Sequence, residues 1–245
     1  YLKRTPTSAG NRKVWTWAGW LKPNFSDGNG GSVFASDDGT NQVIIRFGRS
    51  GDVIQVAYWN GSSYTWDLRS SQVIRDCGSW YHLIVSVDTT STVSSDRIKL
   101  YLNGNLITDF TTETYPSINF ETIIGKLQPH GVGAMTGGSN ADLWPGNMTD
   151  LFFVDGQALT PDVFGYYKKG DGYISAGSTQ ATDFKKGQWV PKAPKVIKSV
   201  INARGGFGVN GFYLPMNDST NVGADLHCAP NSIIKLKGED EPQPY

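Results

Sequence analysis

Short runs that alternate apolar with polar residues follow one another along the first two thirds of the chain. In the run at residues 80–88, four apolar side chains lie on one face with a period of two, which is typical of a half-buried strand. Aromatic and β-branched residues dominate these runs. The pattern predicts strands at 14–22, 31–36, 42–47, 53–59, 63–69, 80–88, 97–102, 105–110, 120–124, 149–154 and 211–216.

Turn residues separate these runs at regular intervals. Asn60-Gly61 and Asn103-Gly104 each stand between two strand-like runs, and Asn-Gly tolerates the positive φ angles of tight hairpins. The second pair predicts the clearest hairpin of the chain, with 105–110 as its return strand. At Thr160-Pro161-Asp162, a cap residue followed by Pro predicts one helical turn.

The strand pattern predicts an all-β fold, an antiparallel two-sheet β-sandwich, over residues 1–165. After residue 166 the pattern weakens, and the chain becomes polar and Gly-rich, with Pro191 and Pro194. We therefore expect an irregular C-terminal extension over 166–245, with one strand-like segment and an acidic, Pro-containing tail. Since this stretch is too long for a compact free loop, we expect it to dock on a neighbouring subunit.

Composition narrows the class of protein. The 245 residues carry 22 basic and 22 acidic side chains, so the basic excess of a nucleic-acid binder is missing. No run of 18 apolar residues predicts a membrane span. Two cysteines, Cys77 and Cys228, could pair, but two separate thiols are the simpler interpretation.

Two sets of motifs resemble known families. The run at 80–87 followed by 98–104 (IKLYLNG) is similar to the central hairpin of laminin G-like and concanavalin A-like lectin domains. Other blocks resemble the laminin G-like module of tail-fibre and related virion structural proteins of marine bacteriophages. These blocks are 1–6, 9–13, 15–17, 150–161, 189–192 and 210–214. In that family a strand begins several residues before the equivalent of Tyr1, so we expect a piece of a longer protein.

The resemblance implies a concanavalin A-like jelly roll carried on a virion surface, often as a trimer on fibres. Its implied roles are assembly with other virion subunits and attachment to a host-surface glycan. Fold resemblance alone does not prove function.

Glucanases share this fold, so catalysis has to be weighed. Retaining glycosidases need two carboxylates about 5 Å apart, commonly glutamates on one strand. The chain has only Glu113, Glu121, Glu239 and Glu241, and no strand carries a Glu-x-Asp-x-x-Glu pattern. The histidines, His82, His130 and His227, accompany no Gly-x-Ser-x-Gly elbow. We therefore expect a protein that is not an enzyme.

Two kinds of binding site remain as hypotheses. Related sandwiches hold Ca²⁺ on a rim, and two turns offer the oxygen ligands that Ca²⁺ takes. The candidate metal ligands are Asp37, Asp38 and Asn41, and a second set is Asn217, Asp218, Asn221 and Asp225. Both turns are equally consistent with ordinary Asx capping, so no cofactor is required. Candidate sugar-binding residues are Trp59, Asn60, Tyr64 and Trp144, in loops at the ends of the sandwich.

Three functions follow from these observations. The first is a non-enzymatic virion structural or adhesion module of a tail fibre, spike or capsid surface, on the virion surface or otherwise extracellular. The second is a secreted Ca²⁺-dependent carbohydrate-binding lectin. The third is a polysaccharide depolymerase, against which the shortage of glutamates argues.

Overall fold

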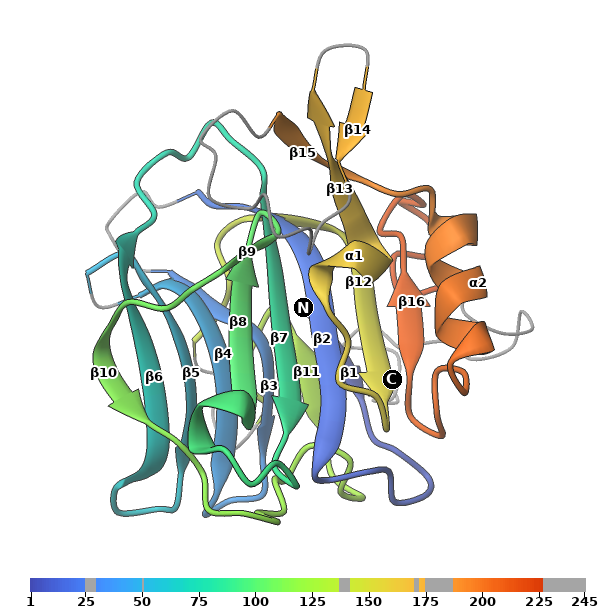
Figure 1. The fold of residues 1–245 in the computed structure, drawn as a ribbon. Coiled ribbons are helices and arrows are strands. Elements are labelled where there is room, and N and C mark those ends of the chain that lie inside the picture. The colour runs from blue at the N-terminus through green and yellow to red at the C-terminus, as the bar shows by residue number, and fades with distance from the viewer. Residues whose placement is uncertain (25–29, 50, 137–141, 170–171, 175–186, 227–245) are drawn as a thin grey trace, which may run out of the picture.

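Two antiparallel sheets make up most of the protein (Figure 1). The computed structural model describes residues 1–24, 30–49, 51–136, 142–169, 172–174 and 187–226. The seven-stranded sheet has the order β1 (Leu2–Arg4), β11 (His130–Val132), β3 (Gly31–Asp37), β4 (Gln42–Arg49), β5 (Val53–Trp59), β6 (Tyr64–Val73) and β10 (Phe110–Thr114). The six-stranded sheet has the order β16 (Phe212–Leu214), β12 (Asn147–Asp155), β2 (Val14–Lys22), β7 (Tyr81–Asp88), β8 (Ile98–Leu102) and β9 (Asn105–Leu106).

Aromatic side chains fill the space between the two sheets. Trp15 and Trp17 from β2 face Phe34 from β3 and Trp66 from β6, and all four are fully buried. Burial of such large side chains is the main favourable contribution to folding of a sandwich. The predicted antiparallel two-sheet β-sandwich is confirmed.

Two strand predictions are wrong. Residues 120–124 form a loop, because the Thr122 backbone N–H and hydroxyl both donate to the Arg12 carbonyl. Ile123 and Ile124 are nevertheless buried in the core, which explains the strand-like pattern. The return strand predicted at 105–110 is only Asn105–Leu106, since the chain then crosses to the other sheet.

The segment after residue 164 is more regular than the sequence suggested. It forms a small third sheet of β14 (Gly172–Ile174), β13 (Gly165–Lys169) and β15 (Gln188–Pro191), followed by helix α2 (Pro194–Ala203). The predicted helical turn is α1 (Pro161–Phe164), and a 3₁₀ turn, η1 (Ser94–Asp96), precedes β8. The strand-like segment at 211–216 contains β16, which pairs with β12.

Helix α2 lies beside β16 (Figure 1) and packs on the outer face of the six-stranded sheet at its β16–β12 end. Ile197 and Ile201 are four residues apart on one face of the helix and are buried with Phe152 and Tyr213. The extension therefore closes one outer face of the sandwich.

Trp189 joins the third sheet to the sandwich. Its indole N–H lies 3.3 Å from His82 Nδ1, and the two rings stack with centroids 6.0 Å apart. A Cβ atom added at Gly104 would lie 2.4 Å from the Trp189 ring, and one added at Gly165 would lie 2.3 Å from it. The Asn103-Gly104 turn must therefore end in glycine for two reasons, its φ of +77° and the indole packed against it.

Among the described residues, no helix is long and apolar enough to cross a membrane. Cys77 is a half-buried free thiol in the loop after β6. Cys228 lies outside the described residues, so its pairing stays a prediction.

Replacing Gly104 by alanine should destabilise the fold more than the same change at Gly39. Both glycines have positive φ, +77° and +90°, but nothing lies within 4 Å of a Cβ at Gly39. We expect Gly39→Ala to cost about 1–2 kcal/mol for the backbone alone, and Gly104→Ala about 1–3 kcal/mol more for the clash. Urea unfolding of both variants measures the difference. Equal losses would show that Trp189 does not constrain the turn.

Acid should unfold the protein through its two buried histidines. Burial lowers the pKa of His82 from 6.5 to about 3 and that of His130 to about 4. Below pH 6.5 the unfolded chain binds two protons that the native state excludes. The free energy of unfolding is therefore at its full value above pH 6.5 and decreases as the pH is lowered. The slope should approach about 1.4 kcal/mol per pH unit for each histidine.

Urea unfolding between pH 6.5 and pH 5 tests this dependence. In His130→Gln the amide oxygen can still accept from the Gly125 N–H, which donates to His130 Nε2 in the native protein. We expect this variant to lose about half of the slope. An unchanged slope would contradict the assignment of His130 as one of the two groups.

Candidate carbohydrate-binding face

A ladder of polar residues crosses the outer face of the seven-stranded sheet. Ser32, Arg46, Gln55 and Arg69 stand opposite one another on β3, β4, β5 and β6. On these strands the alternate positions, such as Ile45 on β4, point into the core. The polar row is therefore a consequence of strand alternation rather than of a special loop.

Two ion pairs hold the arginines of this ladder in place. Arg46 Nε donates to Asp142 Oδ2 at 2.5 Å, and Arg69 Nη2 lies 2.8 Å from Asp67 Oδ2. The aspartates are nearly enclosed, with side chains 1% and 6% exposed, whereas the Arg69 side chain is 33% exposed. Gln55 bridges the pairs, because its amide donates to Asp67 at 3.0 Å and accepts from Arg46 at 3.3 Å.

Burial lowers the pKa of Arg46, while the hydrogen bond with the Tyr64 hydroxyl and the negative charge of Asp67 act in the opposite direction. The guanidinium stays charged throughout the physiological range. Because each arginine has its own carboxylate, the network brings no net charge to this face. Its donors are fixed in direction and need little reorganisation to meet a ligand.

An aromatic pair stands at the edge of this network. Trp59 and Tyr64 are opposite residues of the β5–β6 hairpin, with ring centroids 5.2 Å apart and planes at 73°. The Arg69 guanidinium carbon lies 5.5 Å from the Tyr64 ring centroid. Tyr64 is 37% exposed, and Asn60 is exposed in the adjoining turn, where its side-chain oxygen accepts from the N–H groups of Ser62 and Ser63.

The structure thus brings together three of the four sugar-binding candidates, Trp59, Asn60 and Tyr64. The fourth, Trp144, lies in the core instead of at the surface that we expected. It is 9% exposed and packs edge-on against Phe47 with ring centroids 5.8 Å apart. The loop that carries Trp144 folds inward at this point, so the ring offers no open face to a ligand.

The turn with Asp37, Asp38 and Asn41 does not fit a calcium site. Lys126 Nζ lies 2.9 Å from Asp38 Oδ2, and Asp38 Oδ1 accepts from the backbone N–H of Asn41. Partial burial would raise the pKa of Asp38, but the donors of Asn41 and Lys126 outweigh it and hold the pKa at about 2. Asp37 accepts from the Gly39 N–H and the Gln42 amide. A cation would therefore have to displace an ammonium group.

The aspartates of the second oxygen-rich turn also accept hydrogen bonds from backbone N–H groups. Asp218 accepts from the N–H and hydroxyl of Thr220, and buried Asp225 accepts from the Tyr213 N–H at 2.9 Å. Asn217 and Asn221 belong to the same loop. In the described part of the chain, no group of three or more histidine, cysteine or acidic side chains is placed to hold a metal ion.

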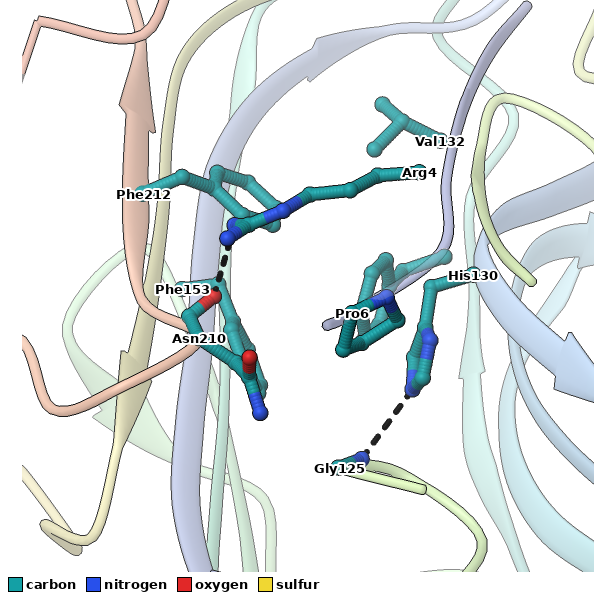
Figure 2. Close-up of a pocket in the computed structure, with 9 residues that line it drawn as sticks. Arg4, Pro6, Gly125, His130, Val132, Phe153, Asn210 and Phe212 are labelled. Atoms are coloured by element: carbon teal, nitrogen blue, oxygen red, sulfur yellow. Dashed lines mark hydrogen bonds between the residues drawn. The ribbon is translucent and has the colours of Figure 1, made fainter. Parts of the chain in front are cut away.

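A small apolar cavity between the sheets, shown in Figure 2, has room for little more than a water molecule, at about 20 Å³. Its polar groups are already engaged, because His130 Nε2 accepts from the Gly125 N–H and Arg4 donates to the Asn210 carbonyl. The cavity is a packing defect beside the N-terminal strand and offers no ligand site.

Both glutamates of the described residues are engaged in polar contacts. Glu121 forms an ion pair with Arg12 at 2.7 Å, and Glu113 accepts from the Tyr115 hydroxyl. Asp67 and Asp142 are bound to arginines, as above. Glu239 and Glu241 lie outside the described residues.

The sequence matches the family model described as the concanavalin A-like lectin/glucanases superfamily over residues 2–163. The chain belongs to this superfamily. The matched range holds both sheets except β16, and it includes every residue of the polar ladder. A search of curated protein sequences found no match.

Solved structures with a similar fold come from several kinds of protein. The heptameric SAP-like pentraxin of Limulus polyphemus is 16% identical, with a TM-score of 0.44, over 78% of this chain and 86% of that one. Domain 4 of the extracellular arabinanase AbnA from Geobacillus stearothermophilus, in complex with arabinotriose, is 20% identical, with a TM-score of 0.47, over 65% and 68%. Tailspike protein 2 of bacteriophage CBA120 (enzymatically active domain) is 12% identical, with a TM-score of 0.41, over 62% and 24%.

Sequence reasoning about this superfamily member missed the arginine network. Asp142 and Arg46 are 96 positions apart, and no local pattern announces their contact. The available signal was the recurrence of Arg46, Gln55 and Arg69 at polar positions of consecutive predicted strands. That recurrence indicates a shared face once the strand order is known.

Proposed function

We propose that this protein is a non-enzymatic adhesion module that binds a surface glycan on the outer face of its seven-stranded sheet. The observation that carries the proposal is the Trp59–Tyr64 pair beside the Arg69–Asp67 ion pair on one accessible face. Membership of a lectin and glucanase superfamily is consistent with it.

Each part of the cluster has a place in sugar recognition. An aromatic ring offers apolar surface to the C–H face of a pyranose or furanose ring. The Arg69 guanidinium and the Asn60 amide supply donors for hydroxyl groups at its edge. Asp67 and Gln55 lie beneath Arg69 and fix its direction, which reduces the entropy lost on binding.

Binding without hydrolysis is the function that the carboxylates favour. A glycosidase needs one free nucleophile and one protonated acid at the scissile bond. Asp67 and Asp142, the carboxylates of the arginine network, are held in ion pairs with arginines. These contacts argue against the depolymerase alternative. The two oxygen-rich turns that a Ca²⁺-dependent lectin would use are held by Lys126 and by their own backbone N–H groups.

The virion setting rests on the sequence blocks that resemble phage tail-fibre modules. Two of these blocks pack against each other, and a third contacts the residue that follows one of them. β16 from the block at 210–214 pairs with β12 from the block at 150–161, and Lys192 from the third donates to the Asp162 carbonyl beside α1. We propose a tail-fibre, spike or capsid-surface protein, exposed on the virion, that assembles with other subunits as a homo-oligomer, with a trimer favoured.

Removing the Tyr64 ring should weaken glycan binding without unfolding the protein. We expect Tyr64→Ala and Trp59→Ala each to weaken binding by about tenfold or more, as truncation of an aromatic anchor does at other binding sites. A glycan array identifies the ligand, and titration calorimetry measures the affinities. Trp80→Ala is the matched control, because Trp80 is 41% exposed but is not part of the cluster. Glycan binding that survives both cluster variants would reject this face as the site.

Assembly is tested separately by the molar mass of the native protein. We expect light scattering to give a multiple of 26.8 kDa, with three times that mass favoured. The oligomer should persist in Tyr64→Ala, since the glycan face is open on the subunit. A mass of one chain at all concentrations would contradict the assembly proposal and leave glycan binding untouched.

A further inference from the structure

A groove opens at the end of β6 that is opposite to the Trp59–Tyr64 cluster, where the edges of the two sheets separate. It has a volume of about 460 Å³, which is within the range of small-molecule sites. β9 ends the six-stranded sheet on one side, and β6 and the segment before β10 form the other side. Ser71 joins β6 to the segment before β10. Its N–H donates to the Asp109 carbonyl and its hydroxyl donates to the Asp109 carboxylate, both at 3.0 Å.

The groove is lined by hydrogen-bonding side chains without a cation. Six of its nine lining residues carry hydroxyl, amide or carboxylate groups: Ser71, Gln72, Asn103, Asn105, Thr108 and Asp109. The other three are Leu102, Leu106 and Ile107. An anion would meet no positive partner among these lining residues. An apolar ligand would remove the amides and hydroxyls from water and offer no hydrogen bonds in place of those that they make to water.

Its frame is rigid where the six-stranded sheet supports it. The Asn103 N–H donates to the His82 carbonyl, and the Asn103 side-chain oxygen accepts from the His82 N–H, both at 2.8 Å. The Tyr167 hydroxyl donates to the Asn103 carbonyl at 2.9 Å. The hairpin turn at the groove is thus fixed from two sides before any ligand arrives.

Two groups of the groove are available to a ligand. The Gln72 amide and the Thr108 hydroxyl form no hydrogen bond with the described residues, and both residues are exposed. Between them they offer donors and acceptors, and Leu106 beside them is 47% exposed. This mixture matches the hydroxyls and C–H faces of a sugar.

We propose that this groove is a second binding site, for one or two rings of an uncharged polyhydroxylated ligand such as a neutral oligosaccharide. It is separate from the Trp59–Tyr64 cluster, which lies at the opposite end of β6. The two sites do not depend on each other for their contacts.

The experiment uses the full chain carrying Tyr64→Ala, which weakens the first site. The probes are neutral trisaccharides of glucose, galactose, mannose or arabinose and their sulfated forms, and saturation-transfer NMR detects binding. We expect at least one neutral trisaccharide to bind, and Gln72→Ala with Thr108→Ala to weaken it about tenfold. Ser199→Ala, an exposed hydroxyl on α2, is the control and should change nothing.

Three results would overturn the proposal. They are no binding of any neutral trisaccharide to the Tyr64→Ala chain, binding that the groove variants leave unchanged, and tighter binding of the sulfated forms. Thermal unfolding of each variant shows that its fold is intact. Because every measurement is made in the same Tyr64→Ala chain, a change caused by the groove variants reports on the groove and not on the first site.

Discussion

The buried carboxylate of Asp155 is the point on which three distant segments of the chain depend. Its two oxygens accept from the backbone N–H groups of Asn11 at 2.6 Å and Asn210 at 3.1 Å. Burial raises the pKa of Asp155, and these two hydrogen bonds oppose the rise. Glycine is required beside it, because a Cβ at Gly10 would lie 2.3 Å from the carboxylate and one at Gly208 2.1 Å from the Asp155 carbonyl. Removing the carboxylate would leave two enclosed N–H groups without acceptors.

This arrangement explains why the blocks at 9–13, 150–161 and 210–214 occur together in one sequence. Asn11 begins the entry into β2, Asp155 ends β12, and Asn210 precedes β16. Each segment supplies one part of a hydrogen-bonded junction and is incomplete alone. In this chain the three blocks therefore form a single junction rather than three independent motifs.

The parts of the fold that could be predicted are those whose signal is local. Alternation and the Asn103-Gly104 pair located β7 and β8, because both signals lie within a few residues. Helix α2 was missed although Pro194 stands at its start and Ile197, Val200 and Ile201 have helical spacing. A cluster of lysines and a second proline outweighed that weak signal. The helix is stable because the six-stranded sheet buries its apolar side.

The same distinction holds for the candidate site. Trp59 and Tyr64 flank one turn, so their proximity follows from the hairpin. Trp144 looked equally exposed in the sequence, but its position is decided by Phe47 and the fold of the loop around it. Whether an aromatic residue in a loop faces solvent depends on tertiary packing, which has no local pattern.

The two outer faces of the sandwich differ in what they can do. α1 and α2 pack apolar side chains against the six-stranded sheet, which buries Ile84, Phe152 and Tyr213 on its outer face. The outer face of the seven-stranded sheet instead carries charged groups that have been neutralised in pairs. A cluster of unpaired arginines would carry a large desolvation free energy and would attract anions in general. Pairing with Asp67 and Asp142 keeps the arginine donors fixed and avoids a strong positive potential on this face. The proposed recognition of a sugar fits such a face, because sugars are distinguished by shape and hydroxyl pattern rather than by charge.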